Sequence, residues 1–233
     1  MKKIFKPTLL ILTGLCLLSF TLNSCKKHHT TPAATTVTDA DGNVYQTVTI
    51  GTQIWTTENL KSTKFNDGTD IPYKPNAADW TAQETPAFCW YNNDEAANKN
   101  KYGALYNREV ANSPLIAPAG WHVPKIADWN ILQNYLGANA GGMLKQTGTA
   151  NWTIPNTGAT NETGFNALAG GLREDTGTFN YLQTRAAFWV KSDDVGNLAF
   201  SQSAIILYNQ SQLYTVNSFN GAFNGLSIRL VKD

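Results

Sequence analysis

Cys89 and His122 are the one cysteine and the one histidine of residues 39–233, and they are the first candidates for a nucleophile and a base. A cysteine attacks as its thiolate, and an apolar setting raises the pKa of a thiol and makes it unreactive. Cys89 stands in the apolar string Phe88-Cys89-Trp90-Tyr91. We therefore interpret Cys89 as a buried, inert thiol.

A hydrolase would have to use His122 as its base. This histidine lies just before an expected helix, where we favour a structural role over a catalytic one. The nucleophile motif Gly-x-Ser-x-Gly does not occur in the sequence. Glu58 and Glu162 are the best acidic candidates, but neither belongs to a pair in an apolar setting, as glycosidase carboxylates do. We expect no catalytic residues, with an enzyme that acts on an envelope or extracellular substrate as the alternative.

Oxygen-bearing side chains in predicted loops raise the question of calcium, which prefers carboxylate and amide oxygens. The residues that could contribute are Asn161, Glu162, Asp193 and Asp194. They lack the fixed spacing that defines a calcium-binding loop. We therefore assign no metal site and no cofactor, and leave calcium binding open.

Aromatic side chains are the strongest indication of binding, because tryptophan and tyrosine rings stack on sugars and anchor protein interfaces. The candidates in or near predicted loops are Trp80, Trp90, Trp152, Tyr181 and Tyr214. The alternative is that most of these rings belong to the core. We expect core positions for Trp55, Trp121, Trp129 and Trp189.

The chain begins with a basic stretch and then an apolar run, which is the order of a secretory signal. The uncharged run from Thr8 to about Leu22 is shorter than the roughly 20 residues of a membrane-spanning helix. It ends in Leu22-Asn23-Ser24-Cys25, which resembles the lipobox of bacterial lipoproteins. We expect residues 1–24 to be a signal peptide and Cys25 to be lipidated. An ordinary cleaved signal is the alternative.

Residues 25–38 are expected to form a tether. Lys26-Lys27-His28-His29 is followed by a segment rich in Thr, Ala and Pro without apolar periodicity. Several acyl chains on one cysteine give durable membrane attachment. We expect an extracytoplasmic lipoprotein of the outer membrane, and the basic residues favour the periplasmic face over the cell surface.

The charge of the mature chain argues against a nucleic-acid partner. Removing the three lysines of residues 1–24 leaves 15 of the 18 basic residues beside 17 acidic ones, a formal charge of −2. No basic block lies beyond the tether, so the electrostatic footprint of a nucleic-acid-binding protein is missing. The remaining roughly 195 residues can bury one sizeable core.

One hairpin and one helix are the clearest predicted elements. Residues 44–50 alternate apolar and polar side chains, and residues 53–60 return after Gly51, as two strands of a hairpin do. The helix is predicted after Pro124 by apolar residues at helical spacing, and Gly137 is its natural end. The apolar residues are Ile126, Trp129, Leu132 and Leu136.

Further strands are predicted in the second half of the chain, between segments rich in turn residues. The predicted strands cover residues 165–173, 186–191, 198–208 and 225–232. The predicted loops cover residues 61–100 and 141–162. One clear helix, several short antiparallel strands and long loops indicate an α+β domain over residues 39–233.

An ordered set of motifs over residues 39–233 resembles the Fibrobacter succinogenes major paralogous domain family. The motifs are Gly51 to Leu60, Phe65-Asn66-Asp67-Gly68, Trp90-Tyr-Asn-Asn-Asp94, Tyr102-Gly-Ala-Leu-Tyr-Asn107, Gly120-Trp-His-Val-Pro124, Asp128-Trp129, Asn156 to Glu162, Gly164-Phe165, Gly170-Gly171 with Arg173, and Arg229 to Asp233. Each motif is weak alone, and their order makes the resemblance specific.

The resemblance implies a C-type-lectin-like fold, similar to formylglycine-generating-enzyme-like domains, in which the first and last strands pair. Many family members carry cysteines where this chain has Ile116 and Leu230, so we expect an apolar contact there. Cys89 does not occupy the late position of a formylglycine-generating cysteine. Ile154-Pro155-Asn156 lacks the acid of the sugar-binding lectin tripeptide.

These observations predict a lipid-anchored binding or interaction module of the bacterial envelope without catalysis. Its expected ligand is a polysaccharide or an envelope protein. A purely structural envelope protein is a further alternative.

Overall fold

The computed structural model describes residue 1 and residues 35–81, 84–192, 200–219 and 224–233. Every helix and strand of these described residues lies in the compact unit Ala33–Asp233. The predicted signal peptide, Cys25 and most of the tether lie outside the described residues. No helix of the described part of the chain is long and apolar enough to cross a membrane.

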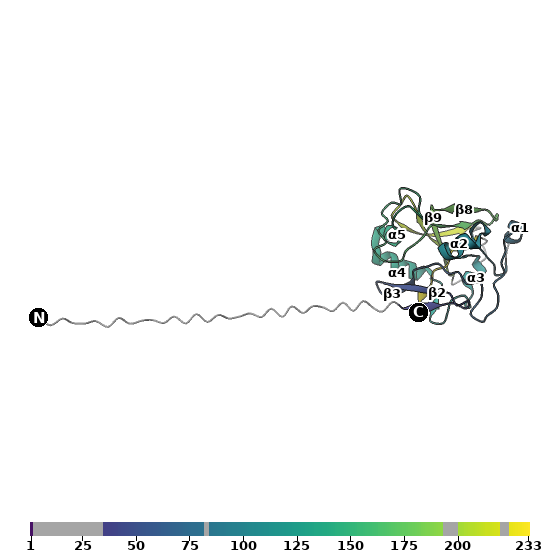
Figure 1. The fold of residues 1–233 in the computed structure, drawn as a ribbon, viewed down its shortest axis with the longest axis horizontal. Coiled ribbons are helices and arrows are strands. Elements are labelled where there is room, and N and C mark those ends of the chain that lie inside the picture. The colour runs from purple at the N-terminus through teal and green to yellow at the C-terminus, as the bar shows by residue number, and fades with distance from the viewer. Residues whose placement is uncertain (2–34, 82–83, 193–199, 220–223) are drawn as a thin grey trace. The chain divides into compact units, whose positions relative to one another are not determined.

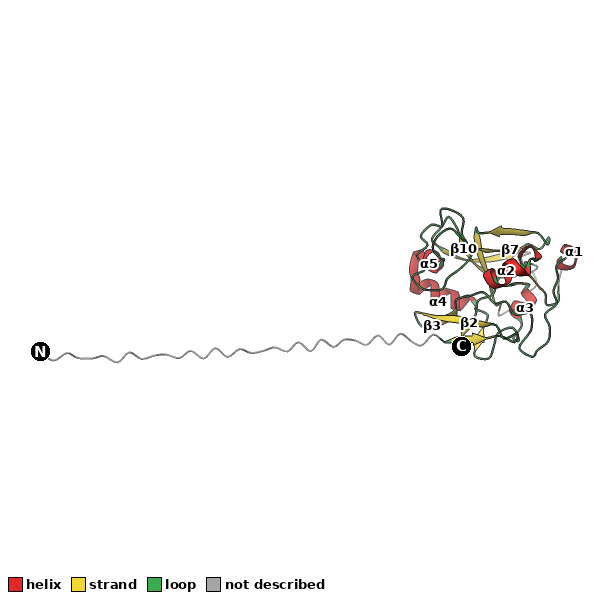
Figure 2. Ribbon diagram, viewed as in Figure 1, coloured by secondary structure: helices red, strands yellow, loops and turns green. Residues whose placement is uncertain are grey.

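The first sheet has the strand order β1-β2-β3-β12-β6 (Figures 1 and 2). Its strands are β1 (Thr36–Thr38), β2 (Val44–Ile50), β3 (Gln53–Thr56), β6 (Trp121–His122) and β12 (Val231–Lys232). The predicted hairpin is confirmed, since β2 pairs with β3 from Thr47 opposite Thr56 to Ile50 opposite Gln53. β1 begins inside the expected tether because buried Val37 pairs opposite Tyr45.

The second sheet has the order β11-β10-β9-β7-β8. Its strands are β7 (Gly170–Arg173), β8 (Phe179–Leu182), β9 (Arg185–Val190), β10 (Phe200–Leu207) and β11 (Leu213–Phe219). A two-residue pair, β4 (Phe88–Cys89) and β5 (Leu105–Tyr106), forms a third, small sheet. The strand predicted over 165–173 is confirmed only in its last four residues, and β11 was not predicted.

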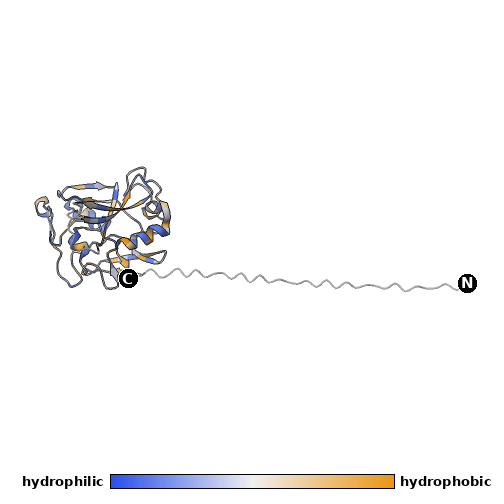
Figure 3. Cartoon of the chain, turned by 180° about the vertical axis from the view of Figure 1, so that it is seen from behind, coloured by the Kyte–Doolittle hydropathy of each residue, from blue (hydrophilic) through white to orange (hydrophobic). Residues whose placement is uncertain are grey.

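The predicted helix is α4 (Ile126–Leu136), and it ends at Gly137 with φ 75°. Apolar and polar residues alternate along it (Figure 3). The sequence predicted one clear helix, and the described residues contain several more. The shorter helices are α1 (Ala77–Trp80), α2 (Glu95–Tyr102), α3 (Arg108–Asn112), α5 (Ala140–Leu144) and the 3-10 turns η1 (Tyr91–Asn93) and η2 (Gly137–Asn139).

The last ten residues connect all three sheets instead of forming the one predicted strand over 225–232. Gly225 bridges to Arg173, Leu226 to Tyr106 and Ser227 to Phe188. Val231 then pairs with Trp55 of β3. The last strand therefore pairs with β3 and β6 in the middle of the sheet, and not with the first strand, β1, at its edge, as the family resemblance implied.

The core contains the expected tryptophans. Trp55, Trp129 and Trp189 are buried as predicted, whereas Trp121 is half-buried against the core. Trp55 and Trp129 lie 4.9 Å apart between ring centroids. Ile116 and Leu230 belong to one buried cluster, as the expected contact between them requires.

Three buried cations are satisfied by backbone carbonyls. Arg229 donates to the carbonyl oxygens of Thr56 at 2.7 Å and Phe165 at 2.8 Å. Lys145 Nζ donates to three further carbonyls. Arg173 donates to the carbonyls of Lys74 and Pro75, beside the candidate site. A buried charge is tolerated only where such partners replace water.

Candidate functional site

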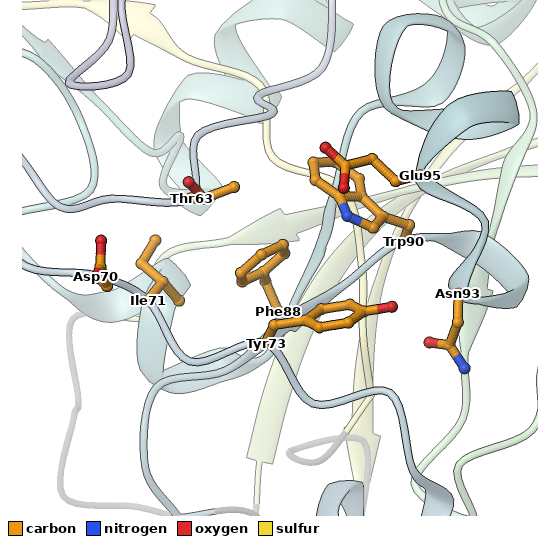
Figure 4. A pocket seen from close by; sticks show the side chains of 8 residues that line it. All are labelled: Thr63, Asp70, Ile71, Tyr73, Phe88, Trp90, Asn93 and Glu95. Atoms are coloured by element: carbon orange, nitrogen blue, oxygen red, sulfur yellow. The ribbon is translucent and has the colours of Figure 1, made fainter.

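A pocket of about 430 Å³ opens between the loop before α1, the strand β4 and the start of α2 (Figure 4). Its lining combines aromatic rings with carboxylate, amide and hydroxyl groups. The lining residues are Thr63, Asp70, Ile71, Tyr73, Phe88, Trp90, Asn93 and Glu95.

Tyr73 presents an aromatic platform to solvent. Its side chain is 43 % exposed, while Phe88 and Trp90 beneath it are 4 % and 2 % exposed. The Tyr73 and Phe88 centroids lie 5.5 Å apart, and Phe88 meets Trp90 edge-on at 5.4 Å. The exposed ring is therefore supported by two successive aromatic contacts, one tilted and one edge-on, that lead to the core.

Backbone pairing with β4 fixes the position of Tyr73. The Phe88 amide donates to the Pro72 carbonyl, and the Lys74 amide donates to the Phe88 carbonyl, both at 3.0 Å. Packing removes water from the Tyr73 ring and raises the pKa of its phenol, and the nearby Cys89 and Glu95 raise it further. The phenol therefore keeps its proton at neutral pH and can donate a hydrogen bond.

Asn93 holds one polar edge of the pocket. Asn92 and Asn93 have φ values of 51° and 57°, a left-handed conformation that asparagine tolerates better than most residues. The Asn93 side-chain nitrogen donates to the Pro75 carbonyl at 2.9 Å. Figure 4 shows the amide oxygen on the side of the Tyr73 hydroxyl, where it can accept from a ligand.

Asp70 and Glu95 supply the charged groups. Asp70 is exposed in a backbone bridge with Lys64. Glu95 is the first residue of α2 and forms an ion pair with Lys99 at 2.7 Å. Of the lining residues that the structure describes, none is a lysine, an arginine or a histidine. Lys99 offsets Glu95 from outside the lining, so the negative charge of the pocket comes from Asp70.

Arg173 anchors the pocket from β7, and it is almost fully buried. Its guanidinium donates to the carbonyls of Lys74 at 2.6 Å and Pro75 at 2.8 Å. Trp80 and Phe179 lie near the guanidinium, with centroids 4.6 and 4.8 Å from it. Arg173 thus fixes the segment that follows Tyr73, although about 100 residues of chain separate them.

Three of the five predicted aromatic ligand-binding residues lie in the interior, which corrects that prediction. Trp80 and Trp152 are fully buried, and Trp90 shows the pocket only a small part of its ring. Trp80 packs on Arg173, and the Trp152 indole donates to the Ala167 carbonyl at 2.9 Å. Rings held in this way have no free face on which a sugar could stack.

The other two predicted aromatic residues lie on the second sheet and do not line this pocket. Tyr181 of β8 is 42 % exposed, with the Arg185 guanidinium 3.8 Å from its ring centroid. Tyr214 of β11 is half-buried, and its hydroxyl donates to the Gln210 side chain.

The nucleophile and base candidates are not brought together. Cys89 is buried, as expected, and forms no disulfide, and burial raises the pKa of its thiol to about 12. His122 Nδ1 lies 2.6 Å from an Asp233 carboxylate oxygen, and Nε2 lies 3.1 Å from one of Asp128. Both ring nitrogens are thus engaged in holding the C-terminal strand to the start of α4.

Two of the four residues considered for calcium, Asn161 and Glu162, lie in the described part of the chain. The Asn161 side-chain oxygen accepts from the Asn166 amide at 2.9 Å, and Glu162 is exposed. Asp193 and Asp194 lie outside the described residues. Within the described ranges, no group of three acidic, histidine or cysteine side chains is placed to hold a metal ion.

A second pocket of about 330 Å³ lies beside α4. Its exposed ring is Tyr135, which is 65 % exposed and packs against Gly51. Glu162 also lines this pocket. No other aromatic ring is among the described residues that line the second pocket. Tyr135 is therefore an exposed tyrosine without supporting rings, and its replacement is a control for experiments on Tyr73.

Sequence reasoning missed Asp70, Tyr73, Asn93 and Glu95 as site residues. The string Trp90 to Asp94 stood out among the family motifs, but nothing in it shows that residues 63–73 fold against it. The useful signal is Tyr73 itself, an aromatic residue between Pro72 and Pro75 in a segment rich in turn residues.

Comparison with curated proteins and with solved structures gave no match. Comparison with protein families gave the Fibrobacter succinogenes major domain, whose model matches residues 48–232. The match covers the two main sheets apart from β1 and the first residues of β2. The chain therefore belongs to the Fibrobacter succinogenes major domain family.

Proposed function

We propose that this protein is a lipid-anchored, extracytoplasmic binding module that recognises a polysaccharide without catalysis. The observation that carries the proposal is the exposed Tyr73 ring, supported by Phe88 and Trp90 and surrounded by polar side chains. Sugar-binding sites need a flat apolar face for the ring and hydrogen-bonding groups for the hydroxyls. The Tyr73 pocket offers both.

The position of the module rests on the sequence before the domain. Leu22-Asn23-Ser24-Cys25 after a basic and apolar segment supports lipidation of Cys25. The tether and the basic residues that follow the cysteine support an outer-membrane protein on the periplasmic side. A lipid anchor fits a binding module, because it concentrates the pocket at the envelope.

The fold we propose for the family is C-type-lectin-like. In its support, the C-terminal strand β12 joins the sheet of β1, β2 and β3, and long loops connect the remaining elements. This arrangement places the end of the chain in the same sheet as the strand that follows the tether.

The experiment is a saccharide-binding screen with the purified full chain in detergent, comparing the native protein with Tyr73→Ala. Tyr135→Ala is the matched control, because it removes an exposed tyrosine from the second pocket. Binding that Tyr73→Ala abolishes and Tyr135→Ala preserves supports the proposal. Binding to an envelope protein alone would favour the interaction alternative, and turnover of a saccharide would favour the enzyme alternative.

A further inference from the structure

The charged groups of the Tyr73 pocket indicate which class of saccharide it would bind. This inference rests on the proposed function. Asp70 and Glu95 are exposed carboxylates on the pocket lining, and none of the described lining residues can carry a positive charge to offset them. In Figure 4, Asp70 lies on one side of the Tyr73 and Phe88 rings and Glu95 on the other. Lys99 offsets the charge of Glu95, so an acidic sugar would be repelled here by Asp70.

The two carboxylates differ in their partners. Glu95 is paired with Lys99 Nζ at 2.7 Å. The Asp70 carboxylate has no hydrogen-bond or ion-pair partner among the residues that the structure describes. Asp70 lines the same pocket as the exposed Tyr73 ring, and a carboxylate and a ring face both attract a cation.

The side chain of Lys99 is an ammonium group that already binds to an acid and an aromatic ring at this pocket. Its Nζ lies 5.3 Å from the centroid of the Trp90 ring while it pairs with Glu95. An acid and an aromatic ring together hold a primary ammonium at one end of the pocket. Elsewhere in the pocket lining, Asp70 and Tyr73 offer the same two chemical groups, and no ammonium group of the described residues forms an ion pair with Asp70.

We propose that the pocket binds a saccharide with a free amino group, such as a glucosamine polymer, with its ammonium at Asp70 and its ring on Tyr73. One exposed ring with polar groups around it suits a sugar face, whereas an isolated ammonium is normally enclosed by several rings. Removal of the positive charge by acetylation should weaken binding, because Asp70 then loses its ion pair.

The test compares a glucosamine hexasaccharide with its fully N-acetylated form and with an oligoglucuronate of the same length. Affinities are measured by titration calorimetry on the full chain in detergent at mildly acidic pH. We expect the amine form to bind tightest. Asp70→Asn should weaken its binding roughly fivefold, the size of a partly exposed ion pair of about 1 kcal/mol, and leave the affinity for the acetylated form unchanged.

Asp67→Asn is the matched control, because Asp67 is exposed in the same loop, accepts hydrogen bonds from Thr69 and does not line the pocket. Equal affinity for the amine and acetylated forms, or no effect of Asp70→Asn, would overturn the amino-sugar inference. The proposed function would survive that outcome if binding still depended on Tyr73. Absence of Tyr73-dependent binding to any saccharide would overturn both.

Discussion

Arg173 and Asn93 donate hydrogen bonds to the same carbonyl oxygen, that of Pro75, at 2.8 and 2.9 Å. Arg173 comes from the second sheet and Asn93 from the turn before α2. Their shared acceptor ties the loop of Tyr73 to two distant parts of the chain. The platform of the candidate site is thus positioned by a buried cation that does not itself line the pocket.

Replacement of Arg173 by lysine should loosen this loop. Lysine keeps the charge but cannot reproduce the fork that reaches the Lys74 and Pro75 carbonyls together. We expect a loss of about 1–3 kcal/mol in the free energy of unfolding, since a buried carbonyl loses its donor, and weaker saccharide binding. Urea titration followed by tryptophan fluorescence measures the first effect. An Arg173→Lys protein with native stability and native affinity would show that the anchor is dispensable.

Lys145 should matter for stability and not for binding. Its buried ammonium donates to the carbonyls of Thr157, Leu207 and Gln210 at 2.7, 3.1 and 2.9 Å. Lys145→Met leaves these acceptors unsatisfied, so we expect unfolding to become easier by about 2–4 kcal/mol. The exposed Lys101→Met is the control and should change little. Equal stability of the two variants in urea titration would contradict this account.

The hairpin, the helix α4 and its end at Gly137 could be predicted from the sequence, because their signals are local. Alternation of side chains, apolar spacing and a C-terminal glycine each act within one turn or one strand. α2 was missed because its sequence Glu95 to Tyr102 has no apolar stripe, although Asp94 caps it through the Ala97 amide at 3.0 Å.

The candidate site could not be predicted because its parts meet only through long-range pairing. Tyr73 is brought to Phe88 by a bridge between an irregular segment and the two-residue strand β4, and Arg173 reaches the loop from another sheet. The same limit explains Trp80 and Trp152. Both lie near turns in the sequence, and their burial depends on partners that no local pattern reveals.

Alkaline pH should destabilise the fold through Tyr45. Burial, and then its hydrogen bond to Asp39, raise the pKa of this phenol far above its ordinary value. The unfolded chain loses that proton near pH 10 and the folded chain keeps it, so stability is retained below pH 10 and falls above it by about 1.4 kcal/mol per pH unit.

Tyr45→Phe removes the proton in question and should make the alkaline decline shallower, although it lowers stability at neutral pH by losing the Asp39 contact. Urea titrations of both proteins over a series of alkaline pH values give the two slopes. Identical slopes would mean that Tyr45 does not contribute to the alkaline loss of stability.

Lipidation should depend on Cys25 alone. Cys25→Ala is expected to abolish incorporation of labelled fatty acid and to release the protein from the membrane fraction, because the acyl chains supply the attachment. Cys89→Ala is the control and should keep the label, since the Cys89 thiol is buried. Labelling that persists in Cys25→Ala would refute the anchor.

The measurement that tests the central claim most directly is the affinity of the full chain and of Tyr73→Ala for the saccharides that the native protein binds. Loss of a stacking ring should weaken binding by about 5-fold to 150-fold, since such contacts contribute about 1–3 kcal/mol. We predict that loss for Tyr73→Ala and native affinity for Tyr135→Ala. Native affinity in Tyr73→Ala, or loss in Tyr135→Ala alone, would contradict the placement of the binding site.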